Sequence, residues 1–232
     1  MGVVEAGSGA AARARRLALR VLPPALAGRG TGRHVALTFD DGPDPASTPA
    51  FLTLLEQLGW RATFFMLGSM VAAYPSLAAE VVAAGHDIGS HGYDHLPQHR
   101  RWPLAVRDDI LRSLEVIAEA TGRSPRWFRP PYGSLSPAGL ATTWPRRVRT
   151  VLWTVSGRDW VLGATPETVA AHVTAGLVGG ATVLLHDSDC ASTPGAWRAT
   201  LGALPLLADA TAARSLRIGP LADHWPPHPP PD

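Results

Sequence analysis

The segment LTFDDGP, residues 37–43, carries the strongest structural signal in this 232-residue chain. An apolar run from Val35 to Phe39 ends in two adjacent acids, Asp40 and Asp41, and Gly42 then turns the chain. The run predicts a buried strand. Its end places two carboxylates side by side, where they repel each other and resist loss of water. We therefore expect a compensating positive charge close to them.

Strand and helix patterns alternate along the chain on both sides of this segment. We expect strands at 35–39, 62–67, 87–90, 127–128, 150–155, 181–185 and 215–218, and helices at 48–58, 76–84, 103–121, from 165 onward and at 197–213. Repeated strand-then-helix units are typical of a parallel sheet, open or closed into a barrel. Ligands of such sheets bind at the carboxyl ends of the strands.

Composition narrows the range of functions. Hydrophobic residues make up 46% of the chain and charged residues 17%, which is typical of a globular protein. All 21 basic residues are Arg, and they form no stripe interleaved with aromatic residues, so we expect no nucleic-acid partner. The single cysteine, Cys190, excludes an intrachain disulfide, and we expect a plain free thiol. No apolar run approaches the roughly 20 residues of an integral membrane segment.

The two ends differ in composition from the middle of the chain. We divide the sequence into a poorly structured basic leader (1–33), an α/β domain (34–222) and a Pro-rich tail (223–232). The apolar part of the leader is short and interrupted by prolines, unlike the core of a signal peptide. This favours a cytoplasmic protein, or a secreted or membrane-associated one if the N-terminus is incomplete. We expect a monomer.

Unusual polar residues follow five of the expected strands. They are the Asp40-Asp41 pair, His91 with His95, Arg129, Asp159 beside Trp160, and His186. Each alone has an ordinary explanation, such as a solvated turn, a structural ion pair or a satisfied polar group. Because carboxyl ends of parallel strands meet at one edge, their joint occurrence favours a common site.

Two histidines separated by three residues can present both imidazoles to one metal ion, from a helical turn or from a tight loop. One carboxylate added to His91 and His95 gives a three-ligand site with open positions for water. A divalent cation would also offset the repulsion between Asp40 and Asp41. One acid would bind the ion, and the other would stay free to take a proton from a coordinated water.

Five motifs in order carry a resemblance to a known family. They are TFDDG at 38–42, H-x-x-x-H at 91–95, RPPYG at 129–133, RDW at 158–160 and LLHD at 184–187. The series resembles the motifs of the polysaccharide deacetylases of the NodB-homology type, carbohydrate esterase family 4. The resemblance implies an α/β fold, a distorted (β/α) barrel of about seven strands, with residues 34–222 as the catalytic domain.

The resemblance also implies the ligands of the cofactor. Asp41, His91 and His95 would bind one divalent metal ion, most often Zn²⁺ in this family, with Co²⁺, Mn²⁺ or Ni²⁺ as alternatives. Asp40 would be the general base, and Arg129 would hold it in position and tune its acidity.

The remaining roles concern the leaving group and the substrate. By the resemblance, His186 would be the general acid and Asp159 would orient it. The backbone N–H of Tyr132 would stabilise the oxyanion. Trp160 and Leu184 would form a small apolar pocket for the acetyl methyl group. Tyr132 and Pro130 would also lie at the substrate.

Two positions depart from the family pattern. Gly92 stands where many members have Ser or Thr, so the loop between the histidines is expected to be less rigid. Ser156 stands where the fourth motif commonly has Asp, which puts nearby substrate contacts in doubt.

These observations predict a metal-dependent hydrolase that removes acetyl groups from N-acetylated sugars, such as N-acetylglucosamine-containing poly- or oligosaccharides, and releases acetate. One alternative is an O-acetyl ester deacetylase or an amide deacetylase of a small glycoside. Another is a non-catalytic carbohydrate-binding member of the family. The sequence leaves the glycan, its length and the metal open.

Overall fold

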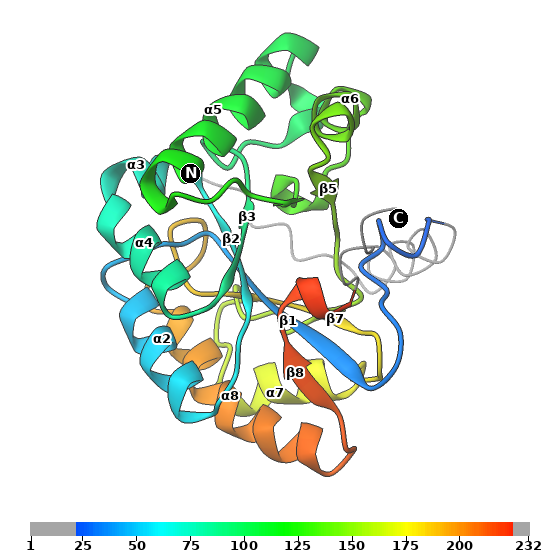
Figure 1. Ribbon diagram of the computed structural model, residues 1–232. Helices are drawn as coiled ribbons and strands as arrows, with labels where there is room; N and C mark the ends of the chain where they lie inside the picture. The colour runs from blue at the N-terminus through cyan, green and yellow to red at the C-terminus, as the bar shows by residue number, and fades with distance from the viewer. Residues whose placement is uncertain (1–21, 225–232) are drawn as a thin grey trace, which may run out of the picture.

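The computed structural model describes residues 22–224 (Figure 1). Its strands are β1 (His34–Asp40), β2 (Thr63–Met66), β3 (Asp87–Ser90), β4 (Trp127–Phe128), β5 (Arg149–Thr150), β6 (Val155–Ser156), β7 (Thr182–His186) and β8 (Arg217–Gly219). Its α-helices are α2 (Thr48–Gln57), α3 (Gly68–Ala73), α4 (Pro75–Ala83), α5 (Pro103–Thr121), α6 (Pro137–Thr143), α7 (Pro166–Thr174) and α8 (Trp197–Ala212).

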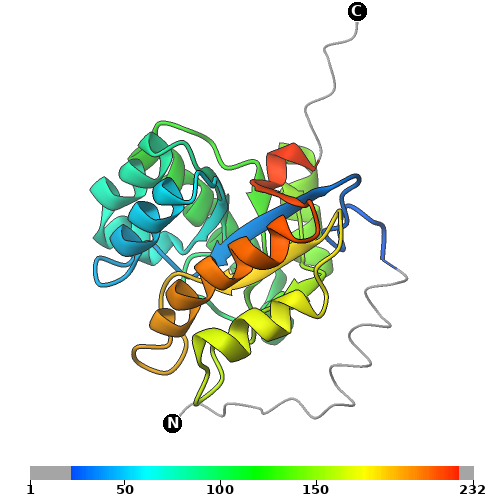
Figure 2. The ribbon, with the colours of Figure 1, turned by 90° about the horizontal axis from the view of Figure 1, so that it is seen from below.

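The strands form one curled parallel sheet with the helices outside it (Figures 1 and 2). The order is β5-β4-β3-β2-β1-β7-β6, and β8 pairs with the beginning of β1. This confirms the distorted barrel expected from the sequence. The expected strand over 150–155 is instead two short strands, β5 and β6, at opposite edges of the sheet. The chain passes between these edges through residues 151–154, so one local run cannot remain straight.

The two faces of β1 have different surroundings, and this separates the core from the site. Val35, Leu37 and Phe39 point to one face and pack in the large core between sheet and helices. Side chains in a strand alternate between faces, so Ala36 and Asp40 point to the inside of the barrel. Every residue of β1 is buried, as a strand covered on both faces must be.

Local sequence signals set several helix boundaries. Proline occupies the first turn of α2, α4, α5, α6 and α7, where its missing N–H costs no hydrogen bond. Helix α5 covers the expected 103–121 and stops at Gly122, which adopts a left-handed conformation with φ 67°. Helices α3 and α6, of 6 and 7 residues, were not expected from the sequence.

The described part of the leader is ordered, so the expectation of a poorly structured segment is wrong for residues 22–33. Ala27 is fully buried, and the Leu26 carbonyl accepts the N–H of Leu152 at 2.9 Å. At the other end, the first residues of the expected tail also pack, because buried His224 contacts His34 with 2.7 Å between their Nδ1 atoms. Residues 1–21 and 225–232 lie outside the described chain, and the domain division remains a prediction.

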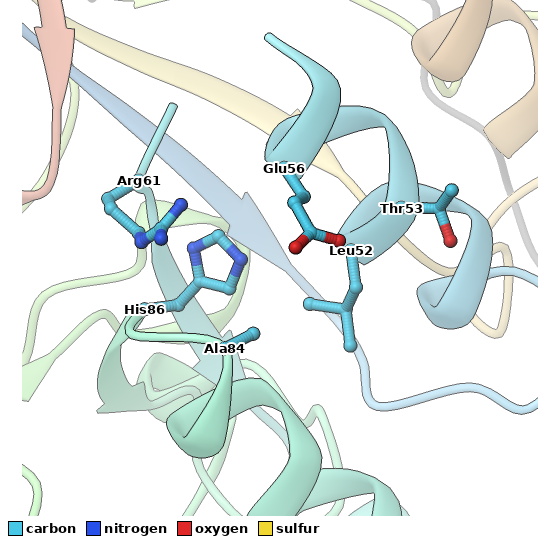
Figure 3. A pocket seen from close by; sticks show the side chains of 6 residues that line it. All are labelled: Leu52, Thr53, Glu56, Arg61, Ala84 and His86. Carbon is cyan, nitrogen blue, oxygen red and sulfur yellow. The ribbon is translucent and has the colours of Figure 1, made fainter. Parts of the chain in front are cut away.

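A small pocket of about 170 Å³ lies at the amino ends of β2 and β3 (Figure 3). Its ionisable side chains are those of Arg61, Glu56 and His86. The Ala62 N–H donates to His86 Nδ1 at 3.2 Å, which gives this buried histidine a structural role. The polar residues that the sequence places at strand ends belong to the opposite end of the barrel. Among residues 22–224, no helix has the length and apolar character needed to cross a bilayer.

Candidate active site

The expected site residues meet at the carboxyl ends of the strands. Asp40 ends β1 and His186 ends β7, and the two are register partners on neighbouring strands, so their side chains share one face. His91 directly follows β3 and Arg129 directly follows β4. These four residues therefore lie at one edge of the sheet, as their positions after the strands predict.

Asp41, His91 and His95 form a compact group with their ligand atoms within 4.8 Å of one another. Asp41 Oδ1 lies 3.3 Å from His95 Nε2 and 3.6 Å from His91 Nε2. Among residues 22–224, Asp41, His91 and His95 are the set of His, Cys, Asp or Glu side chains whose spacing would allow them to hold a metal ion. Asp41 and His95 both have positive φ, at 84° and 53°, a conformation that is uncommon for residues other than glycine.

The donor atoms of this group fit a divalent cation. Asp41 Oδ1 is buried without a hydrogen-bond partner, which is costly for a carboxylate oxygen unless a cation compensates it. His91 Nδ1 donates to the Arg129 carbonyl at 2.8 Å, which leaves the Nε2 lone pair facing Asp41. Burial lowers the pKa of His91 and His95 to about 3, with Arg129 adding to the effect at His91 and His91 at His95. Both imidazoles are therefore neutral at neutral pH, the form in which an imidazole can bind a metal ion.

Asp40 is held by a different set of contacts. Arg129 Nη1 donates to Asp40 Oδ1 at 2.7 Å and to Thr38 Oγ1 at 2.8 Å, and Arg129 Nη2 donates to the Leu152 carbonyl at 3.2 Å. The fully buried Arg129 guanidinium also lies 4.0 Å from the centre of the Phe65 ring. Burial raises the pKa of Asp40, and the charge of Arg129 opposes this. The carboxylate is fixed but remains more basic than one in water.

The surroundings of His186 favour its protonated form. Asp159 Oδ1 lies 3.0 Å from His186 Nδ1, and Asp159 Oδ2 accepts the His186 backbone N–H at 2.7 Å. Thr200 on α8 donates to the same Oδ2 at 2.7 Å. Burial alone would lower the pKa of His186, but the charge of Asp159 and its hydrogen bond, together with the Asp40 and Asp41 charges, raise it to about 10. His186 is therefore protonated at neutral pH.

The expected substrate residues surround these groups. Tyr132 is 63% exposed, and its backbone φ is 58°. The centroid of its ring lies 4.6 Å from that of the His95 ring. The Trp160 ring meets the His186 ring edge to face at 5.3 Å. Leu184 is buried in a cluster that Trp160 joins, and Pro130 is buried next to Arg129.

A cavity of about 360 Å³ lies next to His95, and Tyr132, Asp94 and Cys190 also line it. Cys190 is a free thiol, as expected, and its Sγ lies 3.7 Å from the Asp41 carbonyl oxygen. The cavity gives an elongated ligand room beside the group.

Several supporting residues were not identified from the sequence. Thr38 shares the inner face of β1 with Asp40, and the two-residue period of a strand could have revealed it. Thr200 carried no signal, because nothing local brings α8 to Asp159. Asp187 accepts the Gly42 N–H at 3.2 Å and the Thr48 hydroxyl at 2.6 Å, which joins the loops after β1 and β7.

Comparison with known proteins identifies the family. The family model described as polysaccharide deacetylase matches residues 27–143. The chain belongs to the polysaccharide deacetylase family. A chitooligosaccharide deacetylase from Bradyrhizobium sp. (strain ANU 289) is 37% identical over 199 residues, which cover 82% of this chain and 89% of that relative.

Solved structures agree with this membership of the polysaccharide deacetylases. The peptidoglycan N-acetylglucosamine deacetylase Bc1960, solved with an N-oxidanyl-benzamide, superimposes with a TM-score of 0.79 at 28% identity, covering 85% of this chain and 91% of its own. A family 4 carbohydrate esterase from Streptomyces lividans, in complex with acetate, gives a TM-score of 0.72 at 32% identity, covering 81% and 92%.

Proposed function

We propose that this polysaccharide deacetylase is a metal-dependent hydrolase that removes acetyl groups from N-acetylated sugars and releases acetate. The main observation in support is that one group suited to accept a proton and one suited to donate a proton lie beside Asp41, His91 and His95. Asp40, a buried carboxylate with a raised pKa, and His186, an imidazole with a raised pKa, are partners on adjacent strands.

Asp41, His91 and His95 would hold the metal ion, for which Zn²⁺ is our first choice because tetrahedral zinc accepts imidazole and carboxylate ligands. When bound, such an ion lowers the pKa of a coordinated water and polarises a carbonyl oxygen.

The remaining steps use residues of the chain. Asp40, fixed by Arg129, takes a proton from the water that attacks the acetyl carbonyl carbon. The Tyr132 backbone N–H donates to the oxyanion of the tetrahedral intermediate. His186, protonated because of Asp159, donates its proton to the sugar nitrogen as the carbon–nitrogen bond breaks. Trp160 and Leu184 enclose the acetyl methyl group.

The names of the relatives suggest the class of substrate. Chitooligosaccharide deacetylases and peptidoglycan N-acetylglucosamine deacetylases both act on N-acetylglucosamine units, and we propose the same unit for this chain. The open cavity beside Tyr132 is consistent with a sugar that continues beyond the reacting residue.

The proposal is tested by measuring acetate release from chitooligosaccharides, peptidoglycan fragments, acetylated xylan and small N-acetylated glycosides, with chelator-treated and zinc-restored enzyme. We expect release from an N-acetylglucosamine oligomer that disappears on metal removal and returns with Zn²⁺. Equal rates with and without metal would contradict the metal-dependent mechanism. Release from acetylated xylan alone would favour the O-acetyl ester alternative.

A further inference from the structure

The two residues that follow His91 are held by hydrogen bonds at every backbone polar group. The carbonyl groups of Gly92 and Tyr93 accept the first two N–H groups of α3, at 2.9 and 3.1 Å. The Gly92 N–H donates to the side chain of Ser90 at 3.2 Å. The Tyr93 N–H donates to Asp109 Oδ2 at 3.0 Å. Asp109, which lies on α5, is the one charged group among these four partners.

Asp109 is itself fixed. Its side chain is only 10% exposed, and its second oxygen, Oδ1, accepts Arg101 Nη1 at 2.8 Å. A charged acceptor in such a partly desolvated position makes a stronger hydrogen bond than a neutral one. The Asp109 carboxylate therefore connects α5 to the loop between the two histidines by accepting the Tyr93 N–H. Its other oxygen is held by Arg101.

The same carboxylate explains why residue 92 is a glycine. Gly92 has φ +83°, and a Cβ at this position would lie 2.9 Å from Asp109 Oδ2. The space that a side chain at position 92 would need is taken by Asp109. The loop lacks a side-chain hydroxyl at position 92, and Asp109 from α5 accepts one of its backbone N–H groups. The lower rigidity of the loop stays a prediction.

The hydrogen bond from Tyr93 to Asp109 matters for the proposed site because of the conformation of His95. Its φ of 53° is a conformation that residues other than glycine keep only when their surroundings enforce it. Hydrogen bonds to Gly92 and Tyr93 hold the backbone two residues before His95, and so they restrain where the His95 backbone lies relative to Asp41. A freer loop would let His95 relax away from the other two ligands.

We propose that Asp109, supported by Arg101, is a positioning residue for the metal site, holding the His91–His95 loop in its ion-binding conformation. The inference rests on the proposed function, because it assumes that Asp41, His91 and His95 bind a cation. It assigns to Asp109 no contact with the ion or the substrate.

The test is the dissociation constant of Zn²⁺, measured by competition with a chromophoric chelator on the full chain. We expect Asp109→Ala to weaken zinc binding by about 10–100-fold, the usual effect of losing a residue that orients a metal ligand. Asp109→Asn keeps the size of the side chain but places an N–H₂ donor against Tyr93 N–H or Arg101, and we expect a loss of about tenfold. Arg101→Ala should weaken binding less than Asp109→Ala.

Two neighbouring residues supply matched controls. Asp108 and Arg107 pair with each other on the surface of α5, with side chains 67% and 51% exposed. Asp108→Ala and Arg107→Ala should leave the zinc affinity unchanged.

The outcomes separate the two claims. Folded Asp109→Ala and Asp109→Asn variants with wild-type zinc affinity would overturn this inference and leave the proposed function standing, and so would an equal loss in Asp108→Ala. If Asp109→Ala does not fold, Asp109→Asn and Arg101→Ala decide the question. A wild-type chain that binds no zinc would overturn the metal site, and this inference with it.

Discussion

Asp40 and Asp41 are adjacent in the chain and both lie near His91, but their other partners differ. Asp40 lies in extended strand and contacts Arg129, whereas Asp41 has φ 84° and turns its carboxylate to His91 and His95. Both carboxylates nevertheless lie near His91 Nε2, at 3.7 Å from Asp40 Oδ2 and 3.6 Å from Asp41 Oδ1, and burial, together with the charge of Asp40, raises the pKa of Asp41. The proposed roles, with Asp40 as the base and Asp41 as a metal ligand, rest on the hydrogen bond from Arg129 to Asp40 and on the grouping of Asp41 with His91 and His95.

Replacement of Asp40 by Asn tests its role as base. The amide keeps the shape but cannot accept a proton from water, so we expect turnover on an N-acetylglucosamine oligomer to fall by about 10²–10⁴-fold. The zinc content should stay at the wild-type value, because the three proposed ligands are untouched. Turnover close to wild type would show that another group is the base.

Replacement of Asp159 by Asn tests the proton on His186. His186 is the proposed acid, so activity should fall as pH rises through its pKa, which Asp159 helps to hold at about 10. Without this negative charge, the pKa of His186 falls, and we expect the alkaline limb of kcat to move to lower pH by about one unit or more. The measurement is the pH profile of kcat for both enzymes. An unmoved alkaline limb would contradict the pairing.

The expected site residues were predictable because they follow strands and because their motifs resemble a family. Thr200 and Asp109 escaped prediction because each acts from a helix whose position against the site is a matter of tertiary packing. Gly92 departs from the family pattern, and the Asp109 carboxylate lies in the space that a side chain at position 92 would need. A sequence shows which group is absent, but not which distant group takes its place.

At the scale of elements, the loop between β1 and α2 is tied to the loop after β7. Thr48 at the start of α2 donates to Asp187 Oδ2 at 2.6 Å and accepts the Asp44 N–H at 2.8 Å. Gly42 is required beside them, because a Cβ there would collide with the Asp187 carboxylate. These contacts connect the strand end that carries Asp40 with the one that carries His186.

Replacement of Thr48 by Val tests how much the hydrogen bonds between these two loops stabilise the fold. The change removes both hydrogen bonds in a fully buried place, so we expect the free energy of unfolding to fall by about 1–3 kcal/mol. Thr53→Val, on the same helix but exposed, is the control and should change it by less than about 0.5 kcal/mol. Urea denaturation of both variants makes the comparison. Equal small effects would mean that the connection adds no stability.

Elements with strong local signals were predictable, and those set by sheet closure were not. Helix α5 has an apolar stripe, a proline at its start and a glycine at its end, and its bounds matched. Helices α3 and α6 are too short to show a periodic stripe. The run over 150–155 has strand composition, but its ends pair with different strands, β4 and β7. No local pattern encodes that bend.

For the whole molecule, the chain before β1 is connected to the inside of the barrel. The Gly28 carbonyl accepts the Thr182 hydroxyl at 2.6 Å, and the Leu26 carbonyl accepts the Leu152 N–H at 2.9 Å. The carbonyl of Leu152 in turn accepts from Arg129, which holds Asp40. A segment outside the sheet thus supports the region that positions the proposed base.

A truncation experiment tests this support. A chain of residues 34–232 lacks these hydrogen bonds and the buried Ala27, so we expect its free energy of unfolding to be lower by at least about 2 kcal/mol than that of a chain of residues 22–232. The measurement is urea denaturation of the two chains under the same conditions. Coincident transitions would show that residues 22–33 contribute nothing to the fold.

The most direct test of the account is an anomalous difference map, measured at the zinc edge from crystals grown with one equivalent of Zn²⁺. We predict a single strong peak about 2.0–2.2 Å from an Asp41 carboxylate oxygen and from Nε2 of His91 and His95. Asp40 should lie outside the coordination sphere with its contact to Arg129 intact. A map without a peak at this position, or one in which Asp40 replaces Asp41 as ligand, would contradict the account.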